Sequence, residues 1–154
     1  MHARLDFRAA SPAAFAAMLQ LNAAVHACGL APALLELVKL RVSQLNGCAF
    51  CIELHAAAAR RAGIDAPRLQ QLGRWRESAL YGDAERAALR WAERLTRLSG
   101  DEVSDVDYDR VRMQFDETQI AHLSLAVAEI NAWNRLMLAA RMPVQPARGA
   151  ADAR

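Results

Sequence analysis

The stretch ELVKLRVSQLNGCAFCIELH, residues 36–55, holds the densest group of reactive side chains in the chain. Two cysteines, Cys48 and Cys51, have the spacing C-x-x-C, and His55 follows four residues after the second. Before them, an Asn-Gly pair at 46–47 tolerates a left-handed backbone and predicts the end of one helix just before the next begins. We therefore expect a helical hairpin that carries the cysteines at its turn.

The sequence on both sides of this hairpin predicts helices and no sheet. Alanine, leucine and arginine dominate, and all three are strong helix formers. Alternating runs of β-branched or aromatic residues are absent. Capping residues, prolines and glycines predict helices over 11–28, 32–46, 48–63, 65–73, 83–100, 104–115 and 116–143. Short loops favour antiparallel neighbours, so we expect an all-α, compact bundle of about six to seven helices.

Length and composition indicate an ordinary globular protein. The 154 residues fit a single domain spanning 1–154, with a disordered tail from about residue 144. The composition is 54% hydrophobic and 23% charged, and the net charge of +2 is too small to indicate a nucleic-acid partner. No apolar run approaches the roughly 18 residues that span a bilayer. We expect neither a nucleic-acid nor a membrane partner.

The use of cysteine fits a reducing compartment. The N-terminal residues carry charges where a signal peptide needs an apolar core, so we expect a cytoplasmic protein. Three cysteines are too few for a disulfide scaffold, and cytoplasmic thiols are normally kept reduced. An intracellular C-x-x-C is typical of a redox-active or a metal-binding site.

The spacing of the cysteines favours redox chemistry. On a helix, Cys48 and Cys51 share a face with Cβ atoms about 5–6 Å apart, near the range for a disulfide. His55 extends the same stripe. The positive end of the helix lowers the pKa of Cys48 most, whereas a hydrogen bond from His55 acts most on Cys51. These arguments leave open which thiol is the nucleophile.

Glu36 lies on the first helix of the hairpin and can reach the second. It is about ten residues (~15 Å) before the turn, and His55 is about eight residues (~12 Å) after it. In an antiparallel pair these distances match, so a contact between the two side chains is feasible. The carboxylate would orient the imidazole or relay a proton. We expect Lys39 either to line the site or to be a solvated charge, and His26 to be a packing or surface residue.

A zinc site is the main alternative chemistry. Cys48, Cys51, His55 and Glu36 are all zinc ligand types. Four ligands from two short turns would strain tetrahedral geometry, and the sequence has no second Cys/His cluster. We therefore expect no metal and no cofactor. A purely structural cysteine pair is a further alternative.

An extended motif resembles that of a known family. The pattern E-x₂-K-x₃-S-x₂-N-x-C-x₂-C-x₃-H is similar to the core motif of AhpD-like alkylhydroperoxidases, in the carboxymuconolactone decarboxylase superfamily. Segments 85–96 and 130–135 also resemble this family, and the likeness covers about residues 9–143. The motif residues are Glu36, Lys39, Ser43, Asn46, Cys48, Cys51 and His55.

The resemblance implies an all-α fold and a thiol peroxidase or disulfide-reductase reaction. It assigns peroxide attack to Cys51, which becomes a sulfenic acid, and disulfide formation to Cys48. Glu36 and His55 would relay protons. A dithiol reductant, either a lipoylated or a thioredoxin-like protein, would restore the thiols. The family also implies a homo-oligomer, from dimer to hexamer.

One position departs from the family pattern. The founding peroxidases have a histidine just before the second cysteine, where this chain has Phe50. We therefore expect a weaker peroxidase or a different electron acceptor. The family's decarboxylases lack the cysteine pair, which argues against decarboxylation here. The competing hypothesis is a non-enzymatic redox switch or interaction protein that uses the same disulfide.

Overall fold

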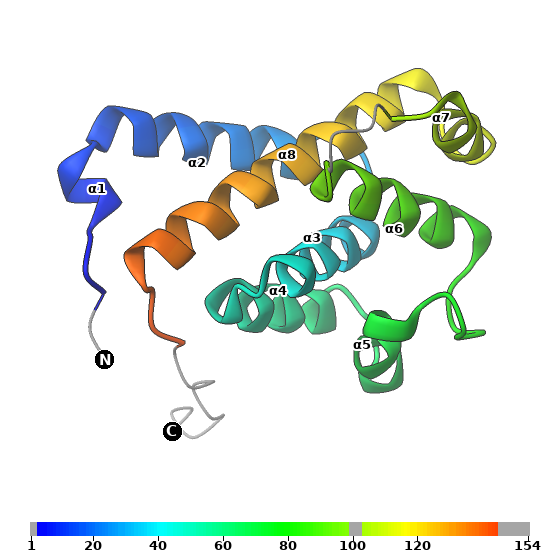
Figure 1. Cartoon of the computed structure of the whole chain (residues 1–154), viewed down its shortest axis with the longest axis horizontal. Coiled ribbons are helices and arrows are strands. Elements are labelled where there is room, and N and C mark those ends of the chain that lie inside the picture. Colours follow the sequence, from blue (N-terminus) through cyan, green and yellow to red (C-terminus); the bar gives the residue numbers. More distant parts are fainter. Residues whose placement is uncertain (1–2, 99–102, 145–154) are drawn as a thin grey trace.

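The structure, a computed structural model, describes residues 3–98 and 103–144. Within these ranges it contains helices and no strand, which confirms the all-α prediction. In chain order the elements are α1 (Phe7–Ala10), α2 (Pro12–His26), α3 (Pro32–Asn46), α4 (Ala49–Arg61), α5 (Ala66–Gln71), the 3₁₀ helix η1 (Leu72–Arg74), α6 (Asp83–Thr96), α7 (Asp105–Arg112) and α8 (Glu117–Ala140) (Figure 1).

The sequence missed α1 and placed several helix ends a few residues too late. Asp6 caps α1, because its carboxylate accepts hydrogen bonds from two backbone N–H groups of the first turn. Helix α6 ends at Thr96 instead of residue 100, and Leu98 beyond it is 68% exposed, so no burial supports another turn. Residue 100 itself, and the part of the predicted tail that follows residue 144, lie outside the described residues.

The longest helix ends three residues before the proline at position 143. Arg141 has a left-handed backbone with φ 51°. The Met142 N–H then donates to the carbonyl of Met137 at 3.0 Å, which closes the last turn. The turn itself ends α8, and the proline follows it. The predicted stop at Pro143 was therefore slightly late.

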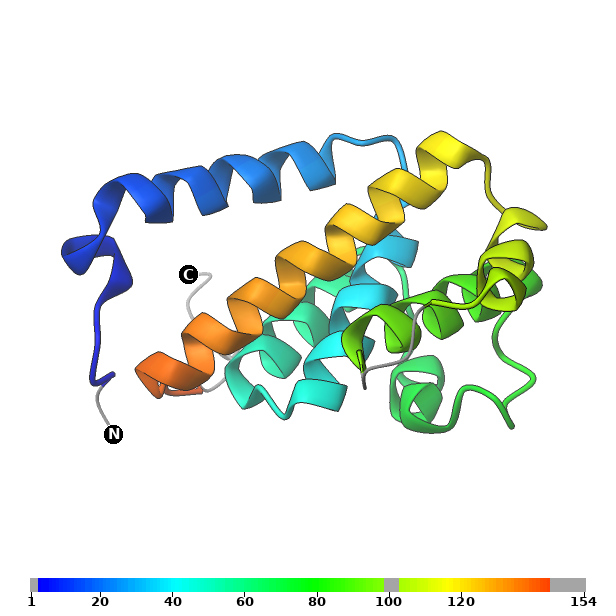
Figure 2. The same cartoon turned by 45° about the horizontal axis from the view of Figure 1, so that its top comes forward.

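Helix α3 lies at the centre of the bundle. It packs against α4, α6 and α8. The long α8 crosses the molecule diagonally, with α2 on one side of it and α3, α4 and α6 on the other (Figures 1 and 2). Within the described part of the chain, no helix has both the length and the apolar character needed to cross a membrane.

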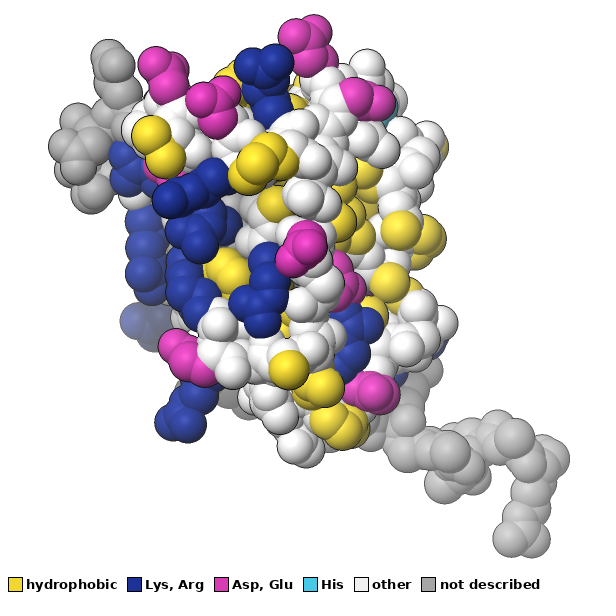
Figure 3. Space-filling model, turned by 90° about the vertical axis from the view of Figure 1, so that its right-hand side faces the viewer, with side chains coloured by type: hydrophobic (Ala, Val, Ile, Leu, Met, Phe, Trp, Pro, Cys, Tyr) yellow, Lys and Arg dark blue, Asp and Glu magenta, His cyan; other side chains and the backbone are white. Residues whose placement is uncertain are grey.

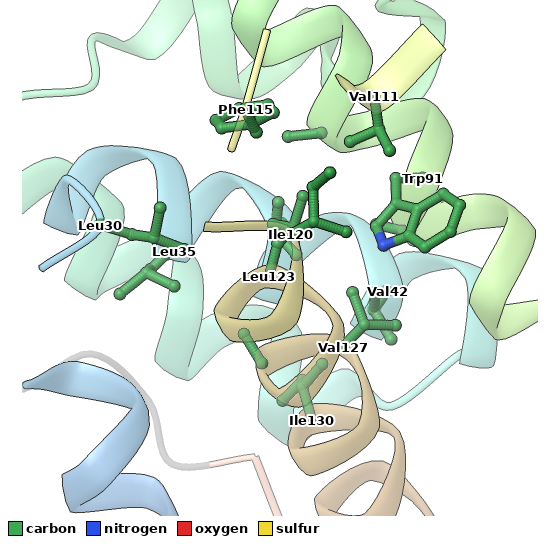
Figure 4. Packing of buried hydrophobic residues seen from close by; sticks show 14 of the residues in the cluster. Leu30, Leu35, Val42, Trp91, Val111, Phe115, Ile120, Leu123, Val127 and Ile130 are labelled. Atoms are coloured by element: carbon green, nitrogen blue, oxygen red, sulfur yellow. The ribbon is translucent and has the colours of Figure 1, made fainter. Parts of the chain in front are cut away.

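The main hydrophobic core joins α3 to α6, α7 and α8. Its buried side chains include Leu35, Val42, Trp91, Val111, Leu123, Val127 and Ile130 (Figure 4). Burying one large apolar side chain stabilises the fold by about 1.5–3 kcal/mol. This core therefore fixes α3 against α8, and most of the candidate site residues described below lie on those two helices and on α4 or the turn before it.

Arginine side chains gather, with scattered carboxylates, on the side of the molecule that carries α6 and α7 (Figure 3). The buried Glu93 of α6 accepts hydrogen bonds from Arg41 Nε at 2.7 Å, Trp75 Nε1 at 2.9 Å and Arg76 Nη2 at 2.6 Å. Since these donors come from α3 and from the irregular segment before α6, one carboxylate connects three parts of the chain.

Candidate active site

The turn between α3 and α4 positions both cysteines. Gly47 has φ 68°, a left-handed conformation that glycine adopts without steric cost. The Cys48 N–H donates to the carbonyl of Ser43 at 3.1 Å. Cys48 is the N-cap of α4, one residue before the helix begins. The predicted helix start was thus one residue early, and only Cys51 lies within the helix.

Cys48 and Cys51 are joined by a disulfide, with Cα atoms 5.3 Å apart. The Cys51 N–H also points at the Cys48 sulfur, at 3.4 Å. Both residues are almost fully buried, with exposed fractions of 1% and 2%, and they pack against Met137 and Phe50. A backbone donor aimed at the Cys48 sulfur would stabilise a thiolate there in the reduced protein.

Amide side chains fasten the turn to α8. Asn46 Nδ2 donates to the Oδ1 atoms of Asn131 and Asn134, both at 2.9 Å. Asn134 Nδ2 in turn donates to the hydroxyl of Ser43 at 3.1 Å. The motif residues Ser43 and Asn46 thus hold the cysteine-bearing turn in place through α8.

Glu36 and His55 are in contact, as the hairpin geometry predicted. The distance between Glu36 Oε2 and His55 Nδ1 is 2.8 Å, and both side chains are buried. Burial by itself raises the pKa of Glu36, but the hydrogen bond from His55 and the charges of His55 and Lys39 lower it below the ordinary value. Because an ionised carboxylate only accepts, His55 donates from Nδ1, and its Nε2 is left to exchange protons.

A cavity of about 560 Å³ opens beside this pair. Cys51 and His55 of α4 line it, whereas Cys48 is not among the lining residues. Its other lining residues are largely apolar and come from the N-terminal segment, α1, α2, α4 and α8, among them Leu5, Phe7, Phe15, Leu19, Phe50, Leu54, Ile130, Trp133, Met137 and Met142. The cavity thus distinguishes the two cysteines, because it gives a small molecule access to Cys51.

The N-terminal segment is attached to the end of α8. Arg4 donates from its backbone N–H to Ala140 O at 2.9 Å and from Nε to Ala139 O at 2.7 Å. These carbonyls belong to the last turn of a helix, where partners within the helix are missing. The attachment places residues 3–8 along one wall of the cavity.

Sequence reasoning missed a second buried ion pair. Lys39 Nζ lies 3.0 Å from Glu129 Oε2, and both side chains have no exposed surface. Lys39 is therefore no solvated charge. Asn22 Nδ2 donates to Glu129 Oε1 at 2.7 Å, and His26 Nε2 is 3.2 Å from Lys39 Nζ. The available signal was the run VAEINAWN of α8, where polar residues interrupt an otherwise apolar stripe.

The geometry of the four predicted site residues does not resemble a metal centre. The sulfurs of Cys48 and Cys51 form a disulfide with each other, and the Glu36 carboxylate is hydrogen-bonded to His55. Across residues 3–98 and 103–144, no group of three or more His, Cys, Asp or Glu side chains is arranged to hold a metal ion.

Comparison with known proteins identifies relatives over most of the chain. The model of the carboxymuconolactone decarboxylase family matches residues 12–94. The uncharacterized protein YdfG of Bacillus subtilis (strain 168) is 44% identical over 104 residues, which are 68% of this chain and 71% of YdfG. The uncharacterized protein YnjA of Escherichia coli (strain K12) is 30% identical over 74% of this chain, a match that spans only 62% of YnjA.

Two solved structures share the fold. A protein of unknown function from Agrobacterium tumefaciens, suggested to be the antioxidant defence protein AhpD, is 33% identical with a TM-score of 0.90, over 94% of this chain and 99% of that one. An uncharacterized peroxidase-related protein from Silicibacter sp. TM1040 is 24% identical with a TM-score of 0.76, over 84% and 69% respectively. The resemblance read from the motif is confirmed: the chain belongs to the carboxymuconolactone decarboxylase family and has an AhpD-like fold.

Proposed function

We propose that the protein is a thiol-dependent peroxidase that reduces organic hydroperoxides or hydrogen peroxide through Cys51 and Cys48. The observation that carries the proposal is the position of Cys51, which lines an apolar cavity together with His55 and lies within disulfide distance of Cys48. Glu36 holds the imidazole from its other side. The antioxidant role suggested for the similar Agrobacterium tumefaciens protein is compatible with this chemistry.

The arrangement supports a two-step oxidation. His55 takes the proton of the Cys51 thiol, and the thiolate attacks the terminal oxygen of the hydroperoxide. The S–O bond forms as the O–O bond breaks, and the leaving alkoxide takes the proton back from His55 to become an alcohol. The Cys48 sulfur then attacks the Cys51 sulfur of the sulfenic acid. The S–S bond forms, and the hydroxyl leaves as water with the proton of the Cys48 thiol.

A dithiol must complete the cycle. Exchange with a lipoylated or thioredoxin-like protein would return both cysteines to thiols, and the dithiol would itself become a disulfide. Since the cavity reaches Cys51 and not Cys48, we expect a thiol of the reductant to attack the disulfide at the Cys51 sulfur. The homo-oligomeric state, the cytoplasmic location and the absence of a nucleic-acid partner remain predictions.

Serine variants test the proposal. With an alkyl hydroperoxide and dithiothreitol, Cys51→Ser is expected to abolish peroxide consumption, because a hydroxyl is a poor nucleophile at neutral pH. After reduction and removal of dithiothreitol, Cys48→Ser is expected to consume one equivalent of peroxide and to form a sulfenic acid that a dimedone probe detects. Full turnover by Cys51→Ser would refute the proposed function.

A redox switch is the second candidate, and the burial of both half-cystines favours it. With exposed fractions of only 1% and 2%, the disulfide gives a large protein reductant little access. A switch would be oxidised once by peroxide to the disulfide, and its return to the dithiol form would be slow. Counting free thiols after a measured dose of peroxide, alongside turnover with several dithiols, distinguishes the two. Oxidation in stoichiometric amount without turnover would favour the switch.

A further inference from the structure

The ion pair of Lys39 and Glu129 takes no part in the cycle proposed above. Both side chains of the pair are completely buried. Moving two charges out of water costs several kcal/mol each, and their mutual attraction often does no more than offset this. Apolar side chains of similar volume would fill the same space at least as well. Packing therefore does not account for the pair, and its position relative to the site is the more informative feature.

Two further side chains complete the contacts of the pair. Asn22 donates to the second oxygen of Glu129, at 2.7 Å. On the other side, Lys39 Nζ meets His26 Nε2 at 3.2 Å. An ammonium group can only donate, so Nε2 accepts and the imidazole is neutral. Burial and the charge of Lys39 lower the pKa of His26, which agrees with a neutral ring.

These four side chains, called the Lys39 array below, adjoin the proposed site on two sides. Glu129 and Asn22 line the same cavity as Cys51 and His55. Lys39 follows Glu36 by three residues on α3, so the two side chains lie on one face of the helix. The charge of Lys39 acts on Glu36, in addition to the stronger effect of the hydrogen bond from His55. The Lys39 array is thus placed to influence the carboxylate that holds the imidazole.

We infer that Lys39 and Glu129 are positioning residues that set the charge balance at Cys51, an inference that rests on the proposed function. The Lys39 ammonium adds to the effect of His55 in favouring the ionised form of Glu36, which accepts from His55 Nδ1 and leaves His55 Nε2 to face the thiol. Glu129 anchors the ammonium and adds a negative charge to the cavity wall. The two residues therefore act on the thiolate in opposite directions.

The test measures the reactivity of Cys51 without any peroxide. In a background with the other two cysteines replaced by serine, the rate of alkylation by iodoacetamide is followed against pH. Lys39→Met is expected to move the midpoint of the profile to higher pH by about 0.5–1 unit, because a nearby cation is lost. Glu129→Gln is expected to move it to lower pH by a similar amount. Lys39→Arg, which keeps the charge, should stay close to the parent.

Opposite shifts of the two midpoints distinguish an effect of charge from a loss of structure. If Lys39→Met and Glu129→Gln only loosened the fold, both midpoints would move in the same direction. Leu37→Met, a conservative change at another fully buried position of α3, is the packing control and should leave the midpoint unchanged. If Lys39→Met does not fold, the isosteric Glu129→Gln carries the test alone. Unshifted midpoints in folded variants, or shifts of the same sign, would overturn the inference. Absence of peroxide turnover in the parent, with opposite shifts present, would refute the proposed function instead.

Discussion

At the scale of single residues, the structure holds buried carboxylates in two different ways. Glu93 accepts hydrogen bonds from three side chains of two separate segments, and it is not among the residues that line the cavity. Among the residues that the structure describes, Glu36 has one hydrogen-bond partner, His55, with Lys39 as a neighbouring charge. A carboxylate that accepts several hydrogen bonds suits a structural role, whereas a carboxylate with one titratable partner can take part in proton exchange.

Glu93→Gln is expected to lower the free energy of unfolding by about 1–3 kcal/mol at pH 7, because an amide accepts these donors less strongly than a carboxylate. Burial raises the pKa of Glu93, but the hydrogen bonds from Arg76, Trp75 and Arg41 outweigh it, so the pKa of this carboxyl in the folded protein lies below its ordinary value. The unfolded chain therefore binds the proton more readily. The stabilisation is full above the unfolded pKa and is lost as pH falls through the folded pKa.

Urea unfolding at pH 7 and at pH 3.5 measures this effect. The parent should lose more stability on acidification than the Glu93→Gln variant does. Asp109→Asn is the control, since its ion pair with Arg112 is exposed on both sides and should contribute almost nothing. An identical acid dependence in the parent and in Glu93→Gln would show that this carboxylate does not carry the pH response.

At the scale of elements, the α3–α4 hairpin depends on the left-handed turn before Cys48. Gly47→Ala is expected to cost about 1–2 kcal/mol of stability, because at φ 68° a Cβ atom crowds the carbonyl oxygen that follows it in the same stretch of backbone. Lack of space is not the obstacle, since no atom of the other described residues, the two chain neighbours aside, lies within 4 Å of the added Cβ. The strain would shift Cys48 relative to Cys51 and make the disulfide easier to reduce.

Gly63→Ala provides a matched control for this change. Gly63 also has a positive φ, 91°, and a Cβ there would likewise meet no more distant atom of the residues that the structure describes, but Gly63 lies beyond the far end of α4. Thermal unfolding should show a similar loss for both variants, whereas a redox titration with dithiothreitol should differ from the parent only for Gly47→Ala. Equal redox behaviour in the two variants would mean that the turn does not position the disulfide.

The hairpin could be predicted from the sequence because its determinants are local. The Asn-Gly pair, the cysteine spacing and the matched distances of Glu36 and His55 from the turn all lie within twenty residues. The Lys39 array could not be predicted in this way. Its partners Glu129 and Asn22 come from α8 and α2, and their approach depends on how those helices cross α3, which no local pattern encodes.

At the scale of the whole molecule, the cavity is assembled from both halves of the chain. The N-terminal segment, attached through Arg4 to the end of α8, forms one wall, and α2, α4 and α8 form the others. Hydrogen peroxide needs none of this apolar surface. A hydroperoxide with a bulky apolar group would bury it there, at about 25 cal/mol per Å² of apolar surface removed from water.

We therefore predict that kcat/KM is higher for cumene hydroperoxide than for hydrogen peroxide. Leu19→Trp should fill part of the cavity, because Leu19 lines it from α2. This variant is expected to lower kcat/KM for cumene hydroperoxide about tenfold and to leave hydrogen peroxide turnover unchanged. Leu80→Trp, at a similarly exposed leucine that does not line the cavity, should alter neither rate. Equal loss with both peroxides in Leu19→Trp would mean that the cavity leads any peroxide to Cys51 but does not select among them.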